Sequence, residues 1–285
     1  MAESTRDIKR RIRGISNTRQ ITKAMELVSS AKLRRAREQM EKSRPYYNTV
    51  YENIQNTLFN AKGIKHPYLE IRDVENTLYI VITADRGLAG GFNSNIIRKV
   101  EHEIQDKKEN SHLITVGLKG REYFKRRDYK IVGEFVGMTE EPRFSHAREI
   151  GEIVMDLYKK GQVDEVNIVY TEFISTINQK IVKLKLLPNE EVTKDIDGKT
   201  SVVEFEPSPE EVLDYLIPKY IESVIYGALI ESSSSQQGAR RTAMESATDN
   251  ADEMIEELQL SYNRARQAAI TAEISEIVTG AEALK

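Results

Sequence analysis

The sequence contains no cysteine and no tryptophan, and only 7% of its 285 residues are aromatic. Without cysteine there are no disulfides, thiol nucleophiles, thiolate zinc sites or thiol redox switches. The longest strongly apolar run covers only 78–82, far short of the roughly 20 residues that a membrane-spanning helix needs. No apolar signal core follows Met1, so we expect neither secretion nor a cleaved presequence.

Charge of neither sign dominates, since 42 Lys and Arg face 45 Asp and Glu, a net charge of −3. The overall balance gives no argument for a nucleic-acid or anionic-membrane partner. Charged residues make up 31% and hydrophobic residues 39%, whereas globular proteins average about 25% and about 45–50%. This composition favours long, solvated helices over one large core.

The chain divides into three predicted zones. Residues 1–62 and 209–285 are predicted to be helical, and residues 76–206 alternate strands and helices. In the first zone Pro45 predicts a kink or break, because proline lacks an N–H and clashes with the preceding turn. The apolar face of this zone is predicted to contain Ile8, Ile12, Ile15, Ile21, Met25, Val28, Tyr47, Tyr51, Ile54 and Leu58.

The last zone contains no proline after Pro218, and as a helix this stretch is about 100 Å long. Its small and apolar residues follow a heptad repeat, which predicts a coiled coil. The predicted seam is Met244, Ala247, Ala251, Met254, Leu258, Ser261, Ala265, Ala268, Ala272, Ser275 and Thr279. We expect the first zone to be the antiparallel partner, with the basic stretch 8–13 beside the acidic stretch 252–257.

This register leaves roughly the last 20 residues without a partner helix, about 30 Å of single helix. The tip carries a second apolar stripe, formed by Ile270, Ile274, Ile277, Val278 and Leu284. An uncovered apolar helix is prone to aggregation. We therefore interpret the tip as an insertion surface for other subunits, with a frayed terminus as the alternative.

The middle zone predicts a small doubly wound (Rossmann-like) α/β domain with an antiparallel edge strand. Its expected strands are 78–83, 112–116, 130–136, 163–170 and 180–187, and its expected helices are 94–107, 123–127 and 143–160. The fold class is thus α/β, a globular foot combined with a long antiparallel coiled coil of the two terminal helices.

The clearest site candidate is the glycine-rich turn 85–93, DRGLAGGFN, between a strand and a helix. Phosphates bind at such positions in α/β folds, but neither nucleotide-binding glycine motif fits. We therefore favour a tight turn, with Asn93 capping the next helix. The four histidines have no metal-ligand spacing, and no catalytic triad pattern is present.

Residues 1–45 are locally basic, with thirteen Lys and Arg against five Asp and Glu. A nucleic-acid-binding arm would explain this charge, but no aromatic residue for base stacking precedes Tyr46. A helix facing an acidic protein surface explains the same residues. A nucleotide-binding enzyme with helical appendages and a basic nucleic-acid-binding coiled coil remain the alternative functions.

Segments at both ends of the chain have the character of a family signature. The most specific is 270–281, ITAEISEIVTGA. The others are 248–251 (TDNA), 258–267 (LQLSYNRARQ), 8–12 (IKRRI), 18–25 (TRQITKAM) and 85–90 (DRGLAG). Together these segments resemble the gamma subunit of F-type ATP synthases, with 270–281 similar to the C-terminal signature of that family. The resemblance spans essentially the whole chain.

The resemblance implies a rotating shaft that has no active site, cofactor or metal of its own. Its implied partners are the alpha and beta subunits of the catalytic head, the epsilon subunit and the membrane rotor ring of c subunits. It also implies a peripheral position on the cytoplasmic face of a bacterial cell membrane. No nucleic acid is expected.

The resemblance also implies roles for particular residues. Head-contact or coupling positions are Met25, Arg240, Arg266, Gln267, Thr271 and Glu273, and we expect Arg10 and Arg11 to offer weak, transient ion pairs to the head. The tip inside the head is Ile270, Ile274, Ile277 and Leu284. Contact with the rotor ring is expected from Phe205 and Glu206, which is a looser match.

Overall fold

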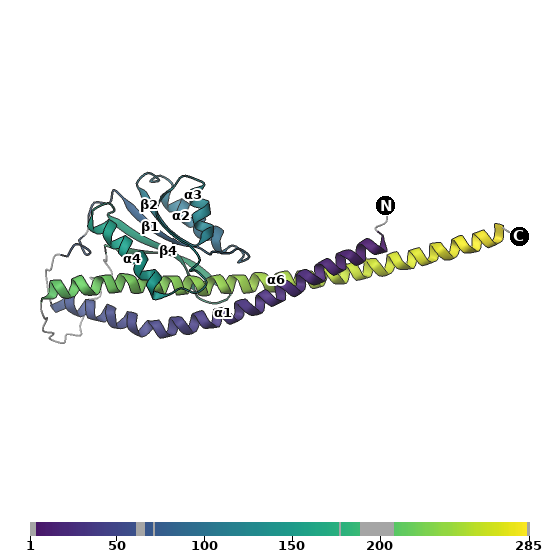
Figure 1. The fold of residues 1–285 in the computed structure, drawn as a ribbon, viewed down its shortest axis with the longest axis horizontal. Helices are drawn as coiled ribbons and strands as arrows, with labels where there is room; N and C mark the ends of the chain where they lie inside the picture. The colour runs from purple at the N-terminus through teal and green to yellow at the C-terminus, as the bar shows by residue number, and fades with distance from the viewer. Residues whose placement is uncertain (1–3, 61–65, 71, 177, 189–207, 284–285) are drawn as a thin grey trace. The chain divides into compact units, whose positions relative to one another are not determined.

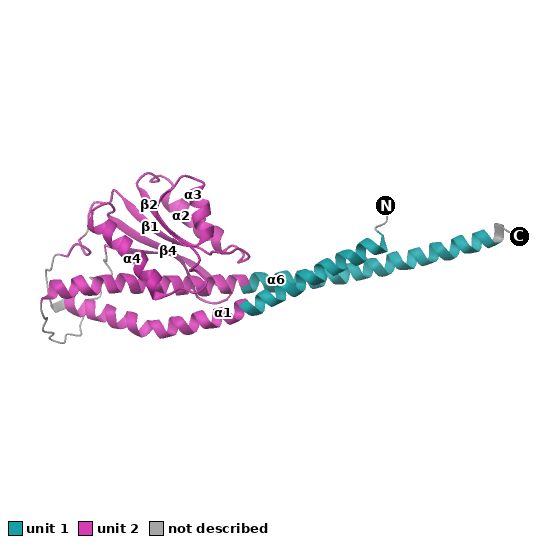
Figure 2. Cartoon of the chain, viewed as in Figure 1, with its two compact units in different colours: residues 1–28, 241–285 teal, residues 29–240 magenta. Residues whose placement is uncertain are grey.

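The computed structural model describes residues 4–60, 66–70, 72–176, 178–188 and 208–283. The chain divides into two compact units, which are coloured separately in Figure 2. Unit 1 comprises residues 1–28 and 241–285, and unit 2 comprises residues 29–240. Two long helices, α1 (Thr5–Asn60) and α6 (Pro209–Ala283), contribute residues to both units.

Unit 2 contains a five-stranded sheet with the order β3-β2-β1-β4-β5. Its strands are β1 (Thr77–Ile82), β2 (Ser111–Val116), β3 (Lys130–Phe135), β4 (Glu165–Phe173) and β5 (Gln179–Leu187). The first four strands pair in parallel, and β5 pairs antiparallel to β4. This arrangement confirms the predicted doubly wound sheet with an antiparallel edge.

Helices cover both faces of this sheet, so every residue of β1 is buried. Side chains alternate between the faces along a strand. Tyr79 and Val81 pack with α2 (Phe92–Ile104) and α3 (Leu118–Lys125). Leu78, Ile80 and Ile82 pack on the other face with α4 (Phe144–Lys159) and with parts of α1 and α6 (Figure 1).

A set of less exposed positions of α1 recurs at spacings of four and three residues, as in a heptad repeat, with one gap of seven residues around the exposed Arg19. This set comprises Ile8, Ile12, Ile15, Thr22, Glu26, Ser29, Leu33, Ala36, Met40, Ser43, Tyr47, Val50, Ile54 and Thr57. The predicted residues Met25 and Tyr51 are also partly covered. The predicted placement of Ile21 and Val28 on this face is wrong, because both side chains are exposed. The repeat that starts at Ile8 instead places the next residue in each case, Thr22 and Ser29, on the covered face. The break expected at Pro45 is also wrong, since α1 continues through it.

In unit 1, α1 and α6 pair antiparallel. Arg19 donates a hydrogen bond to Asp252, and the hydroxyls of Thr22 and Thr248 lie 2.8 Å apart. The predicted register, with 8–13 beside 252–257, is therefore wrong by more than one helical turn. Charge complementarity alone does not fix a register, because α6 is acidic over several turns.

The seam of α6 in unit 1 also differs in part from the prediction. The heptad period is confirmed as far as residue 265, with Met244, Ala251, Leu258 and Ala265 at the predicted covered positions. Ala247 is partly covered beside the more deeply buried Thr248. Met254, at 47% exposure, and Ser261 face solvent, and the residues that follow them, Ile255 and Tyr262, are partly covered instead. The predicted seam positions beyond 265 are exposed: Ala268, Ala272, Ser275 and Thr279. Every residue from 266 to 281 is exposed, which agrees with the expected unpaired tip.

Glu103 joins α2 to the edge strand β5. Its carboxylate accepts hydrogen bonds from Lys99 at 2.7 Å and from Lys183 at 2.6 Å. The bond from Lys183 lowers its pKa most, followed by the bond from Lys99, and together they outweigh the effect of burial. The pKa of Glu103 falls to about 2.

We expect Glu103→Gln to reduce the free energy of unfolding by about 1 kcal/mol near neutral pH. Because the folded-state pKa is depressed, this contribution is present above the unfolded-state pKa of about 4.3. It is lost as the pH falls toward 2. Urea titrations of both proteins at several pH values measure the difference, with the exposed Glu109→Gln as the control. A difference that does not change with pH would contradict the prediction.

Candidate functional site

The glycine-rich turn after β1 is held by Asp85. One carboxylate oxygen accepts the N–H groups of Leu118, at 3.1 Å, and Gly137, at 2.9 Å. The other accepts the N–H and the hydroxyl of Thr139, at 3.1 and 2.8 Å. Burial alone would raise the pKa of Asp85, but these hydrogen bonds outweigh it and lower the pKa.

Asp85 thus connects the loops that follow β1, β2 and β3 at the carboxyl edge of the sheet. Open α/β sheets bind ligands at this edge, yet here three of the backbone N–H groups already donate to a carboxylate. This geometry supports the interpretation of 85–93 as a structural turn rather than a phosphate site.

Asn93 has a different role from the predicted one. Helix α2 has Gly91 at its N-cap and no side-chain cap. The Asn93 side-chain oxygen instead accepts the N–H of Ala84 at 2.8 Å. The expected cap is therefore wrong, and Asn93 fixes the start of the turn to the first turn of α2. Gly90, at φ +53°, supplies the left-handed conformation that the turn requires.

A partly buried polar cluster surrounds Glu140 in unit 2. Its carboxylate accepts a hydrogen bond from Lys32 at 2.5 Å and lies 3.7 Å from the guanidinium of Arg240 and 3.8 Å from that of Arg86. Arg240 also donates to the side-chain oxygen of Gln237 at 3.0 Å. Burial would raise the pKa of Glu140, but the bond from Lys32 and the three positive charges lower it.

The structure separates Arg240 from the other predicted coupling residues. Arg240 is 5% exposed in unit 2, whereas the others lie on the helices of unit 1. There, Arg10 contacts Asp7 at 3.3 Å, Arg11 is exposed and Met25 is partly buried. The sequence contains no sign of the Glu140 cluster, because its members come from distant parts of the chain.

The predicted contact residues of α6 in unit 1 lie together on its exposed end. This set comprises Arg266, Gln267, Ile270, Thr271, Glu273, Ile274 and Ile277. The three isoleucines are about half to two-thirds exposed. Leu284, Phe205 and Glu206 lie outside the described residues.

Sequence analysis missed a second exposed apolar group in unit 1, formed by Ile21, Leu27 and Val28 of α1. Two of these residues were assigned to the seam. Ile21 and Val28 are seven residues apart and lie on the same side of α1 as Met25, whereas Leu27 lies on another side. Exposed apolar residues that gather on one side of a helix are typical of a site of interaction with another protein.

None of the helices in the described part of the chain has the length and apolar character that crossing a membrane requires. Among the same residues, no three His, Cys, Asp or Glu side chains come together in a group that could hold a metal ion.

The family model described as ATP synthase matches residues 4–284. An ATP synthase gamma chain from Alkaliphilus metalliredigens is 56% identical over 290 residues, covering 100% of both chains. A relative from Acetobacterium woodii, named ATP synthase gamma chain, sodium ion specific, is 50% identical and also covers 100% of both.

Solved structures are similar as well. The central stalk and c-ring structure of the Tetrahymena thermophila mitochondrial ATP synthase contains a chain with 27% identity and a TM-score of 0.60, covering 80% of this chain and 99% of that one. A chain of the Euglena gracilis mitochondrial ATP synthase has a TM-score of 0.72 at 21% identity, covering 98% and 94%, and supports the fold alone. This chain belongs to the family of ATP synthase gamma chains.

Proposed function

We propose that this chain is the central shaft of an F-type ATP synthase, a non-catalytic subunit that couples rotation of a membrane ring to conformational changes in the catalytic head. The observation that carries this proposal is the end of α6. Residues 266–281 are exposed on all sides and carry isoleucines at 270, 274 and 277. Such a helix requires a surrounding partner to cover it.

The alpha and beta subunits of the head are the proposed partners for this end and for the exposed apolar residues of α1. Arg10, Arg11 and Arg266 would offer weak ion pairs to acidic loops of the head. Gln267, Thr271 and Glu273 lie on the same exposed stretch and would make polar contacts there. Weak contacts of this kind suit a shaft, because rotation requires several positions of similar energy.

The proposed partners of the foot are the rotor ring of c subunits, through Phe205 and Glu206, and the epsilon subunit. The complex would lie on the cytoplasmic face of the cell membrane.

Arg240 has a different proposed role from the other coupling residues. Because it is buried with Glu140 and Gln237, it would act on coupling by holding α6 in place within unit 2.

Reconstitution tests the proposal. The full chain is mixed with the alpha and beta subunits, the mixture is separated by gel filtration, and ATP hydrolysis is assayed in every fraction. We expect one copy of this chain per six head subunits and no hydrolysis by the chain alone. Elution apart from the head, or hydrolysis by the isolated chain, would overturn the proposal.

Met25→Lys is expected to impair coupling more than assembly. Met25 is partly buried beside the exposed Ile21 and Val28. A lysine at this position puts a strongly hydrated charge on an apolar contact surface. We expect ATP-driven ion pumping to fall several-fold while hydrolysis by the assembled complex is largely retained.

The ratio of pumping to hydrolysis in reconstituted vesicles measures this effect. Met25→Leu conserves side-chain volume and is the matched control, with an expected ratio like that of the natural chain. A normal ratio for Met25→Lys would contradict the role proposed for this position.

A further inference from the structure

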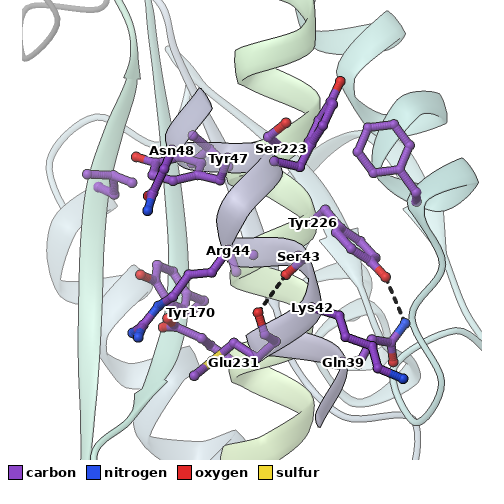
Figure 3. A pocket seen from close by; sticks show the side chains of 17 residues that line it. Gln39, Lys42, Ser43, Arg44, Tyr47, Asn48, Tyr170, Ser223, Tyr226 and Glu231 are labelled. Carbon is purple, nitrogen blue, oxygen red and sulfur yellow. Dashed lines mark hydrogen bonds between the residues drawn. The ribbon is translucent and has the colours of Figure 1, made fainter. Parts of the chain in front are cut away.

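A cavity of about 700 Å³ lies within unit 2, between α1 and α6 (Figure 3). Its size is in the range of small-molecule binding pockets. Tyr46 and Tyr47 of α1, Phe144 at the start of α4, Tyr170 of β4 and Tyr226 of α6 contribute aromatic side chains to its walls. None of the residues to which a coupling role was assigned lines this cavity.

One carboxylate, that of Glu231 on α6, lies among these apolar walls. Its Oε2 atom is buried and has no hydrogen-bond partner among the described residues. Burial raises the pKa of Glu231, and the negative charge of Glu172 raises it further. The positive charge of Arg44 and a hydrogen bond with the Tyr170 side chain lower it, but by less. A buried, unpaired carboxylate oxygen is costly, so its presence requires an explanation.

The cations of the chain do not supply the missing partner. Lys42 and Arg44 of α1 also line the cavity, but both side chains are exposed to solvent. Within the described residues, neither forms an ion pair with Glu231 within 4.0 Å. Arg44 and the hydrogen bond with Tyr170 therefore compensate Glu231 only in part, since its pKa stays raised and its Oε2 atom has no donor among the described residues.

We propose that this cavity binds a small molecule that carries a protonated amine on an aromatic or aliphatic body. The amine would donate to the carboxylate of Glu231, which is a charge-assisted hydrogen bond. The faces of the tyrosine rings attract cations and accept an apolar body. An uncharged apolar ligand would satisfy the walls but would bring no positive charge to the carboxylate.

Gly227 provides a steric test of the location. It lines the cavity from α6, and a Cβ atom added there meets nothing within 4 Å. Leucine at this position would occupy cavity volume without displacing neighbouring atoms at its Cβ. Gly280, on the exposed end of the same helix, also meets nothing within 4 Å and is the matched control.

The experiment uses the full chain and three probes of similar shape: 2-(4-fluorophenyl)ethylamine, the corresponding alcohol and 4-fluorophenylacetate. Fluorine NMR line broadening at neutral pH measures the binding of each probe. We expect the amine to bind with a dissociation constant in the millimolar range or below. We expect at least tenfold weaker binding of the alcohol and none of the anion.

Three variants locate the interaction. Glu231→Gln keeps the shape of the side chain and should weaken amine binding at least tenfold without changing alcohol binding. Gly227→Leu should abolish binding of the amine, and Gly280→Leu should leave it unchanged. Circular dichroism melting curves establish that each variant is folded.

Other outcomes would overturn the proposal. The proposal is overturned directly if the natural chain does not bind the amine. Equal affinity for amine and alcohol, in the natural chain and in Glu231→Gln, would show an apolar cavity without cation recognition. If Glu231→Gln fails to fold, the comparison of amine with alcohol decides the role of charge, and loss of amine binding in Gly227→Leu decides the location.

Discussion

Replacing Glu140 by glutamine is expected to lower the free energy of unfolding by about 3 kcal/mol, because it leaves Arg240 as a buried charge without a counterion. Arg240 is only 5% exposed, and one of its nitrogen atoms, Nη2, has no hydrogen-bond partner among the described residues. Lys32 loses its 2.5 Å bond in the same variant, but its side chain is 30% exposed and reaches water more easily.

Removing the other member of the pair, Arg240, should have a smaller effect on the free energy of unfolding. Arg240→Met removes a positive charge but leaves Glu140 with Lys32 and Arg86, so we expect a loss of about 1–2 kcal/mol. The double variant Glu140→Gln, Arg240→Met should lose less stability than the sum of the two single variants, because Arg240 is then no longer a buried charge without a counterion. Non-additivity of this kind is the signature of a direct interaction.

Urea unfolding followed by circular dichroism measures all of these proteins. Glu141→Gln is the matched control, since it makes the same change at the neighbouring exposed residue, and its expected effect is below about 0.5 kcal/mol. Similar losses for Glu140→Gln and Glu141→Gln would mean that Arg240 does not depend on Glu140.

The sheet is predictable from the sequence because its strands carry a strong local signal. A strand buried on both faces, such as β1, is a short continuous apolar run. The antiparallel edge is also predictable, since β5 follows a short hairpin and carries three lysines among its apolar residues, as edge strands do. The family resemblance was carried by the terminal helices, and the family assignment is confirmed.

The coiled coil was predicted less well because its seam is not purely apolar. Thr22, Glu26 and Ser29 occupy seam positions of α1, while Ile21 and Val28 are exposed. A search for apolar periodicity therefore selects the neighbouring residues. If the exposed apolar residues of α1 contact other subunits, as proposed above, hydrophobicity does not separate the inner face of the helix from the outer one.

The polar sites of unit 2 depend on contacts between distant residues. Glu140 and Lys32 are 108 positions apart, and Thr139 is 54 positions from Asp85. No local pattern marks either pair. Arg240 was identified by resemblance, but its burial against Glu140 required the fold.

The second large effect is expected at Asp85. Asp85→Ala removes the acceptor of three backbone N–H groups and one hydroxyl. Hydrogen bonds to a charged acceptor contribute more than neutral ones, so we expect a loss of about 3 kcal/mol, even though the N–H of Gly137 can bind water instead. Asp106→Ala, at an exposed position after α2, is the control with an expected change below about 0.5 kcal/mol.

Asp85→Asn separates the charge of this residue from its shape. The amide oxygen can still accept from Leu118 and Gly137, but the amide nitrogen then faces the N–H of Thr139, which is also a donor. We expect about half the loss of Asp85→Ala. Urea titrations at neutral pH measure the free energy of unfolding, which we expect to be highest for the natural chain, lower for Asp85→Asn and lowest for Asp85→Ala. Equal stability of the three proteins would contradict the structural role of the turn.

The pH dependence of this difference tests the charge itself. Because the pKa of Asp85 is lowered in the folded protein, its contribution is present above the unfolded-state pKa of about 3.9. It is lost as the pH falls through the folded-state value. The gap between the natural chain and Asp85→Asn should therefore narrow below about pH 4, whereas a gap that stays constant would mean that the turn depends on the shape of Asp85 and not on its carboxylate charge.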